Sequence, residues 1–99
     1  MTDTARLAGM IPVGYENAIT RAELACRMGL NDRQMRQAVE DARAEGVIIL
    51  NRQDGGGYYQ SNDLDDMMRQ YRQDTARALA ILKRRKPLRD KLKAAGRKV

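Results

Sequence analysis

Two predicted helices that meet within two residues constrain the fold of this chain more than any other feature. Thr20 and Glu23 have the spacing of a capping box, in which the hydroxyl accepts from the Glu23 amide and the carboxylate accepts from the Thr20 amide. Gly29 suits the left-handed conformation that ends a helix, and Asn31 with Gln34 suits the start of the next. The sequence therefore predicts two helices joined by a tight turn.

Each predicted helix carries one apolar stripe. The stripe of the first is Ala22, Leu24, Ala25 and Met28, and that of the second is Met35, Ala38, Val39 and Ala42. The second helix ends at Gly46, and its side chains that point away from the stripe are Arg33, Arg36, Gln37, Glu40 and Arg43. Cys26 lies next to the first stripe, and we expect it to pack as a small apolar residue.

Short elements are predicted on both sides of this pair. Residues 4–11 form a short helix that Pro12 and Gly14 end, and residues 17–19 form a brief extended piece. Residues 47–50 and 58–60 form the strands of a hairpin around a glycine-rich tip. Tyr58 and Tyr59 should alternate, with one packed on the helix before the hairpin and the other facing outward or toward the C-terminal helix. The predicted fold class is mainly α with a small β-hairpin (α+β), followed by a long C-terminal helix.

The composition argues against enzyme chemistry. The 99 residues include no His and a single Cys, so the usual zinc ligand sets, the Ser-His-Asp and Cys-His arrangements and an internal disulfide all lack parts. We expect no catalytic residues, no metal, no cofactor and no small-molecule ligand. No apolar run approaches the roughly 20 residues that cross a bilayer, and the N-terminus lacks a secretory signal. We therefore expect a cytoplasmic protein that does not bind membranes.

Positive charge is concentrated in the last third of the chain. Residues 1–62 have a net charge of −1, whereas residues 63–99 have a net charge of +7. The densest run is Lys83, Arg84, Arg85 and Lys86, which suits a phosphate backbone. The alternative is that these cations complement a helix dipole and belong to a solvated tail.

A long helix is predicted from Ser61, as its N-cap, to Pro87. Its apolar side is the series Leu64, Met68, Tyr71, Thr75, Ala78 and Leu82, which repeats at alternating steps of four and three. Such a helix can dock on its own chain or pair with a second molecule. We favour a homodimer through residues 64–82, because Met67 and Leu79 widen the apolar side beyond what one small domain needs. Beyond Pro87, Leu88, Leu92 and Ala95 predict a further short helix in a basic tail.

The order helix, turn, helix and glycine-rich hairpin resembles the winged helix-turn-helix DNA-binding domain of biotin-repressor type, and small winged-helix proteins of prophages most of all. The matching segments lie within about residues 11–60 and are TRAELA at 20–25, GLN at 29–31, EG at 45–46 and GYY at 57–59. Asn31 stands where the family usually has Ser or Thr, which preserves the capping chemistry. The resemblance implies a winged domain over residues 1–61. The long helix at 62–86 and the basic tail at 87–99, expected from their apolar repeat and their charge, fall outside it.

The resemblance also implies which residues contact DNA. The second helix of the pair, about residues 31–45, would lie in the major groove, where Arg33 and Arg36 suit guanine and Gln37 suits adenine. Asp32 could accept a hydrogen bond from cytosine, or its only role could be to cap the start of the helix. The residues suited to phosphates in the winged domain are Thr20, Arg21, Asn31 and Arg52. Outside the resemblance, the charge of the last third adds Lys83, Arg84, Arg85 and Lys86. Arg52 is the only cation of the wing and lies near Asp54, so a strong wing contact is not expected.

Two functions fit these features. The first is a sequence-specific protein that binds double-stranded DNA as a homodimer, a small transcriptional regulator of phage or prophage type. The alternative is an adaptor or assembly protein, of the kind used in phage packaging or replication, whose winged domain and long helix mainly contact proteins. The nearly neutral first 62 residues support the alternative, because domains that read DNA are usually more basic.

Overall fold

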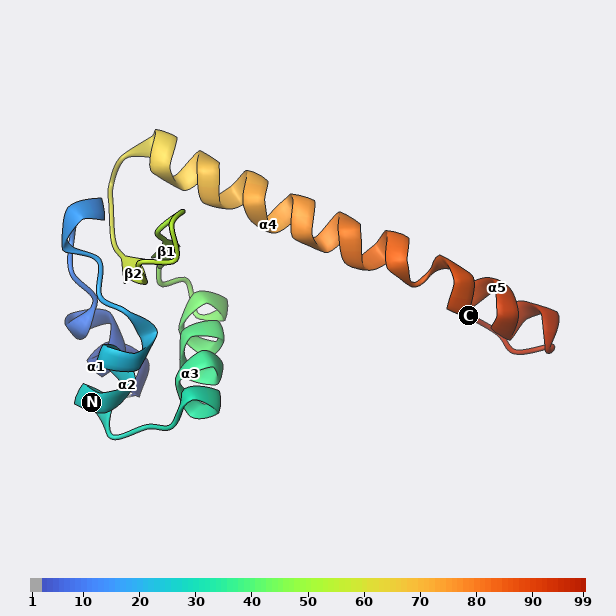
Figure 1. The fold of residues 1–99 in the computed structure, drawn as a ribbon, viewed down its shortest axis with the longest axis horizontal. Helices are drawn as coiled ribbons and strands as arrows, with labels where there is room; N and C mark the ends of the chain where they lie inside the picture. Colours follow the sequence, from blue (N-terminus) through green and yellow to red (C-terminus); the bar gives the residue numbers. More distant parts are fainter. Residues whose placement is uncertain (1–2) are drawn as a thin grey trace. The chain divides into compact units, whose positions relative to one another are not determined.

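The computed structural model describes residues 3–99 and divides them into two compact units, one reaching to Met67 and the other spanning Met68–Val99 (Figure 1). The chain is mainly helical, with one small two-stranded sheet. Its elements are α1 (Asp3–Met10), a short 3-10 turn η1 (Tyr15–Asn17), α2 (Arg21–Met28), α3 (Asp32–Ala44), β1 (Leu50–Asn51), β2 (Tyr58–Tyr59), α4 (Leu64–Arg84) and α5 (Lys86–Ala94).

The predicted turn between α2 and α3 is confirmed. Gly29 lies in the left-handed region with φ 68° and ψ 31°. Asn31 Oδ1 accepts from the Gln34 amide at 2.8 Å, and Gln34 Oε1 accepts from the Asn31 amide at 2.9 Å, which completes a capping box. At the start of α2, Thr20 Oγ1 accepts from the Glu23 amide at 3.2 Å. The second half of that predicted box is wrong, because the Glu23 carboxylate instead accepts from Arg27 at 2.8 Å.

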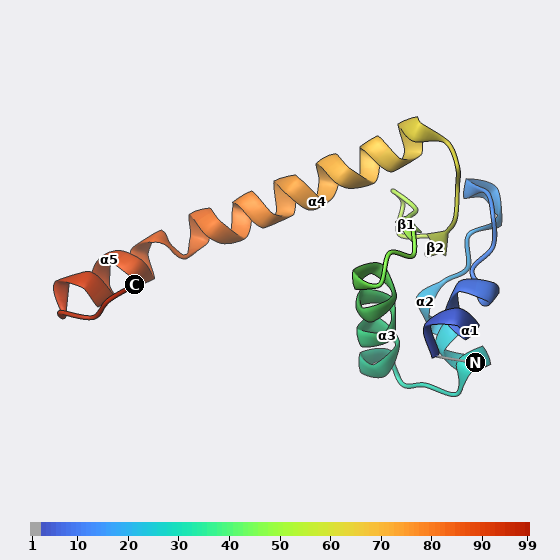
Figure 2. The ribbon, with the colours of Figure 1, turned by 180° about the vertical axis from the view of Figure 1, so that it is seen from behind.

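Helices α1, α2 and α3 enclose the core, and Figure 2 shows the three side by side. Leu7, Leu24 and Met35 are fully buried at its centre. The predicted stripes of both helices are confirmed except at Ala22, which is exposed. Cys26 is also exposed, so its predicted packing is wrong: it lies one residue beyond the edge of the stripe, where α2 faces solvent.

The hairpin forms, but its first strand is displaced from the prediction. Leu50 pairs with Tyr59 and Asn51 with Tyr58, whereas residues 47–49 are not in a strand. Ile49 is nevertheless buried, because it packs in the core while its carbonyl accepts from Arg43. Arg43 is therefore half-buried and holds the hairpin to α3, contrary to the prediction that it faces outward.

The second strand is buried on both sides. Tyr58 and Tyr59 have exposed fractions of 8% and 1%, so neither faces outward, which was one of the two predicted alternatives for the second tyrosine. Tyr59 packs edge-on against Tyr15 of η1, with ring centroids 5.4 Å apart. Tyr58 exchanges two backbone hydrogen bonds with Ile19, at 2.8 and 2.9 Å. The predicted extended piece is thus confirmed only at its end, since Asn17 belongs to η1.

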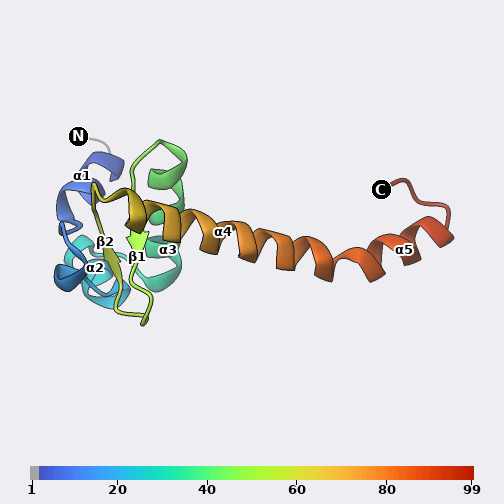
Figure 3. The same cartoon turned by 90° about the horizontal axis from the view of Figure 1, so that it is seen from above.

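The long helix begins two residues later than predicted. Asp63 starts it, because its carbonyl accepts from the Met67 amide and its carboxylate accepts from the Asp65 amide at 2.8 Å. Ser61 instead accepts from the Asp63 amide within the preceding turn. Helix α4 ends at Arg84, and α5 follows with Pro87 in its first turn, which confirms the predicted interruption; Figure 3 shows the break.

Candidate nucleic-acid interface

The outer face of α3 is set by the way the helix is anchored. Met35, Val39 and Ala42 are buried in the core, so the helix cannot rotate without exposing them. Arg33, Arg36, Gln37 and Glu40 consequently lie on the exposed side at the spacing of one helical face. The cations occupy the first two turns, while Glu40 and Asp41 occupy the third. Positive charge on this face is therefore confined to the N-terminal half of α3.

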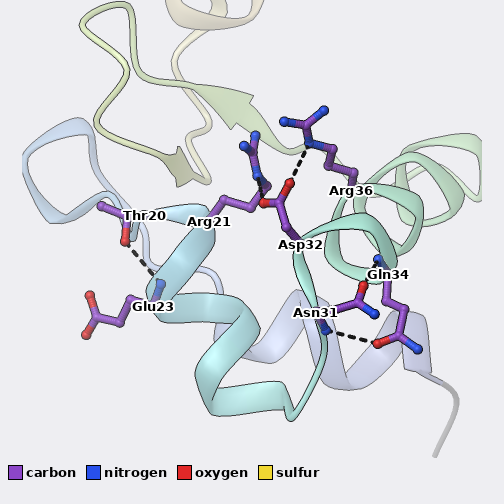
Figure 4. A network of polar contacts seen from close by, with 7 residues as sticks. All are labelled: Thr20, Arg21, Glu23, Asn31, Asp32, Gln34 and Arg36. Carbon is purple, nitrogen blue, oxygen red and sulfur yellow. Dashed lines mark hydrogen bonds and ion pairs between the residues drawn. The ribbon is translucent and has the colours of Figure 1, made fainter.

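Asp32 joins arginines from two helices at the start of α3. Its Oδ1 lies 2.6 Å from Nε of Arg21 in α2, and its Oδ2 lies 3.0 Å from Nε of Arg36, one turn further along α3. Figure 4 shows both guanidinium groups directed to this one carboxylate. Both arginines meet Asp32 through Nε. The terminal nitrogens of Arg36 therefore remain available to an outside acceptor, whereas Arg21 also forms a hydrogen bond with Tyr58. The structure thus gives Asp32 a role in holding two cations, in addition to its place in the first turn of α3.

The same contacts shift the ionisation of the paired groups. The hydrogen bond from Arg21 is the largest cause that lowers the pKa of the Asp32 carboxyl. Removal from water opposes it, and the nearby charges of Arg21 and Arg36 add smaller lowering effects. The hydrogen bond to Asp32 raises the pKa of Arg21, and a hydrogen bond with Tyr58 adds to that effect. The cluster is thus held fully ionised at neutral pH, with two positive charges and one negative charge.

The three predicted base-contact residues of α3, and Asn31, the predicted phosphate residue at its start, differ in how many of their polar atoms are free. Arg33 forms no hydrogen bond or ion pair with any of residues 3–99, whereas Arg36 is paired with Asp32. Gln37 donates from Nε2 to Asp41 at 2.8 Å, so a base would have to displace that bond. Asn31 uses Oδ1 and its backbone amide in the capping box and keeps Nδ2 for an outside acceptor.

Thr20 is the predicted phosphate residue at the other helix start. Its hydroxyl oxygen accepts from the Glu23 amide, so the hydroxyl proton remains free to donate. Arg21 follows it directly and is about one-third exposed, with its guanidinium turned to Asp32 (Figure 4). The Arg21–Asp32 pair therefore joins the start of α2, where Thr20 lies, to the start of α3.

The hairpin contributes a restrained cation. Arg52 lies over the ring of Tyr15 at 4.7 Å and pairs with Asp54 at 3.0 Å. A hydrogen bond with Tyr15, followed by the charge of Asp54, raises the pKa of Arg52. Because the guanidinium is already stacked and paired, the structure makes Arg52 the least available of the predicted phosphate residues in the hairpin and the two helix starts.

Gly57 fixes how the hairpin meets α2. Its φ is 106°, and a Cβ atom there would lie 1.9 Å from the carbonyl oxygen of Ile19. The strand therefore passes against the backbone just before Thr20, at a distance that only glycine permits. Gly57 and the Ile19–Tyr58 hydrogen bonds together place the hairpin beside the start of α2.

The predicted phosphate run lies in the second unit. Lys83, Arg84, Arg85 and Lys86 span the end of α4 and the start of α5, and all four are exposed. In α5, Leu88 and Leu92 share one side, and cations occupy most of the remaining surface: Arg89, Lys91 and Lys93. Within this unit, the run and α5 form one continuous basic segment.

The sequence did not predict the contacts of Asp32 with Arg21 and Arg36. Arg21 and Asp32 each follow a helix cap, so both are first residues of their helices, and this shared position was the available signal. Predicting their contact also requires the angle between the helices, which comes from core packing.

Comparison with known proteins finds no family model, no curated protein and no solved structure that matches this chain. None of the helices within residues 3–99 has both the length and the apolar character needed to cross a membrane.

Proposed function

We propose that this protein binds double-stranded DNA in a sequence-specific manner, as a small transcriptional regulator of phage or prophage type. In this proposal residues 1–61 are a winged helix-turn-helix domain. Helix α3 enters the major groove, and the β1–β2 hairpin is its wing. The observation that carries the proposal is the exposed N-terminal half of α3, where Arg33, Arg36 and Gln37 share one face and Asp32 brings Arg21 beside them.

The arrangement suits base recognition in the major groove. Helices of this kind contact base edges through residues near their N-terminus, which is where α3 has its cations. An arginine whose terminal nitrogens are free can pair with O6 and N7 of guanine. The acids Glu40 and Asp41 stand further along, where they would disfavour an approach of the phosphate backbone to the C-terminal half of α3. The face therefore favours DNA contact at one end of the helix.

Phosphate contacts come from two places in this proposal. Thr20, Arg21 and Asn31 would position the helix pair, since each retains a donor at a helix start. The basic run from Lys83 to Lys86 would add affinity that does not depend on sequence. The seam of α4 would pair two copies, so that two α3 helices read two half-sites.

The test is selection from a random duplex library with the purified protein at about 0.15 M salt, where non-specific binding is already weakened. We expect an enriched motif, and an inverted repeat if a dimer binds. Arg33→Gln and Arg36→Gln should each reduce discrimination at one base pair by about 1–3 kcal/mol. Arg27→Gln is the matched control, because Arg27 is an exposed arginine of α2 that pairs with Glu23 away from this face.

Retention of DNA without any motif, or no retention, would overturn sequence-specific recognition and favour the adaptor function. Equal loss in all three arginine variants would also contradict a specific role for α3. In either case the nearly neutral first 62 residues would be explained by contacts with protein.

A further inference from the structure

The exposed side of α4 has a pattern that reads the same in both directions. Its six residues, here called the seam, are Leu64, Met68, Tyr71, Thr75, Ala78 and Leu82, separated by steps of four, three, four, three and four. All six are exposed, and Leu64 and Tyr71 are exposed to 77% and 70%. An apolar side this long, left open to water on a helix of 21 residues, calls for a partner.

We propose that α4 pairs with α4 of a second copy in the antiparallel orientation, with the twofold axis at Gln73. This inference rests on the dimer of the proposed function and adds its geometry. In antiparallel pairs, the two kinds of seam position face one another. Leu64 then faces Leu82 of the second copy, Met68 faces Ala78, and Tyr71 faces Thr75.

The sizes of the paired side chains favour this orientation. Met68 and Tyr71 are large, and each faces a smaller residue, Ala78 or Thr75. In a parallel pair every seam residue would face the residue of the same number in the second copy. Two alanines would then leave a void, and two tyrosines would be crowded. The antiparallel arrangement gives layers of more even volume, so it buries the seam with fewer voids.

The one polar seam residue is compatible with burial. The Thr75 hydroxyl donates to the carbonyl oxygen of Tyr71 at 2.9 Å within α4. Its hydrogen-bonding need is therefore met without water, and its methyl group remains to pack against the second copy. Burial of Thr75 then leaves no unsatisfied donor.

The charges at the two ends of α4 also favour the antiparallel orientation. Asp63, Asp65 and Asp66 stand at its beginning, and four consecutive cations, residues 83–86, stand at its end. Antiparallel pairing places the acidic beginning of one copy by the basic end of the other, whereas parallel pairing places cations by cations. Two residues that flank the seam near the axis would lie close to their counterparts: Arg72 near Arg72 of the second copy, and Asp74 near Asp74. Each is a single exposed pair of like charges, so the cost is small.

The orientation has a consequence for DNA. Eighteen residues separate Leu64 from Leu82, so the two copies of Leu64 would lie about 27 Å apart along the helix pair. The two α4 starts therefore lie at opposite ends of the pair, and a dimer with this twofold symmetry reads an inverted repeat.

Disulfide trapping tests the orientation. The exposed Cys26 is first replaced by serine, and the variants Leu64→Cys and Leu82→Cys are prepared separately in that background. Under mild oxidation we expect the mixture to form a disulfide between positions 64 and 82, mapped by mass spectrometry. Each variant alone should remain largely uncross-linked. A dominant 64–64 disulfide in the Leu64→Cys variant would overturn the antiparallel orientation.

A second experiment uses the unaltered chain, in case either substitution weakens the pair. A zero-length carbodiimide cross-linker should join Asp65 or Asp66 to Lys83 or Lys86 between copies, identified with mixed isotope labels. Within one copy, the carboxylates of Asp65 and Asp66 lie about 25–30 Å along the helix from Lys83 and Lys86, which is too far for them to react. Absence of this cross-link in a demonstrated dimer would contradict the proposal.

The outcomes separate the orientation from the wider function. A monomer by analytical ultracentrifugation at tens of micromolar would overturn the pair and the proposed dimer together. DNA selection decides base recognition independently, because a monomer can still enrich a single half-site. A dimer with the 64–82 disulfide and no enriched motif would support the pair and overturn the regulator.

Discussion

The residues up to Met67 and those from Met68 onward use their apolar side chains in opposite ways. In the first unit, Leu7, Leu24 and Met35 are fully buried within the chain. In the second, every residue from Asp74 to Val99 is exposed, including Leu79, Leu82 and Leu88. The first unit therefore has an internal core of its own, whereas the apolar side chains of the second unit from Asp74 onward are open to water.

Substitutions in the core and on the exposed surface of α4 should separate these two uses most clearly. Leu24→Ala should lower the free energy of unfolding of the first unit by about 2–5 kcal/mol, because it removes a fully buried side chain and leaves a cavity. Leu79→Ala is the matched change in α4, at a residue exposed to 60%. It should change the same free energy by less than about 0.5 kcal/mol.

Chemical denaturation followed by tyrosine fluorescence measures both variants, since Tyr15, Tyr58 and Tyr59 report on the first unit. Measurements at low protein concentration keep association out of the comparison. If Leu79→Ala were as damaging as Leu24→Ala, the contrast between the two units would be wrong.

A glycine pair tests the close contact that seats the hairpin. Gly57→Ala should destabilise the first unit by about 2 kcal/mol or more, because φ is 106° and the added Cβ would meet the Ile19 carbonyl. Gly55→Ala is the control: its φ is also positive, at 79°, but nothing lies within 4 Å of the added atom. It should cost about 1 kcal/mol, from backbone strain alone.

Thermal melting of the two variants gives the comparison. Equal losses would mean that backbone strain explains both and that the approach to Ile19 has no added cost.

The basic run of the second unit should govern how salt affects DNA binding. Replacing Lys83, Arg84, Arg85 and Lys86 by glutamine should weaken binding to all duplexes alike. The slope of log K against log salt is negative, and each lost phosphate contact should make it less steep by about 0.9. The enriched motif should stay the same, because the run contacts no bases in the proposed complex.

Fluorescence anisotropy between about 0.05 and 0.2 M salt measures the slope. Arg72→Gln with Arg77→Gln is the control, since these changes remove cations from α4 outside the run. Because the run also lies at the proposed pairing surface, the oligomeric state of each variant is checked first. An unchanged slope in a variant of unchanged oligomeric state would remove the run from the interface.

Local chemistry explains what the sequence predicted well. The caps at Gly29 and Asn31 depend on residues within one turn, and both were predictable. The strand expected at residues 47–50 moved because burial of Ile49 and its bond to Arg43 outweighed the strand preference of β-branched residues. The Asp32 link needed the angle between α2 and α3. Base contact by Arg33, Arg36 and Gln37 stays a prediction.

The smallest expected effect concerns Asp32, the carboxylate shared by Arg21 and Arg36. A carboxyl group whose pKa is lower in the folded state than in the unfolded state stabilises the fold at pH values above the unfolded pKa. That contribution is lost as the pH falls through the folded pKa. The loss should therefore appear only on the acid side of the ordinary aspartate pKa of about 3.9. Nothing should change between pH 6 and pH 8 from this group.

Carbon-detected NMR of the Asp32 carboxyl measures this pKa directly. Arg21→Gln should bring it back toward the ordinary value, and more so than Arg36→Gln, because the Arg21 hydrogen bond is the largest cause of the shift. Asp54, paired with Arg52 in the hairpin, serves as an internal control that neither change touches. If neither variant moved the Asp32 pKa, the ion pairs at the start of α3 would be too weak to orient the two arginines. Arg36 would then reach DNA, if at all, as freely as Arg33.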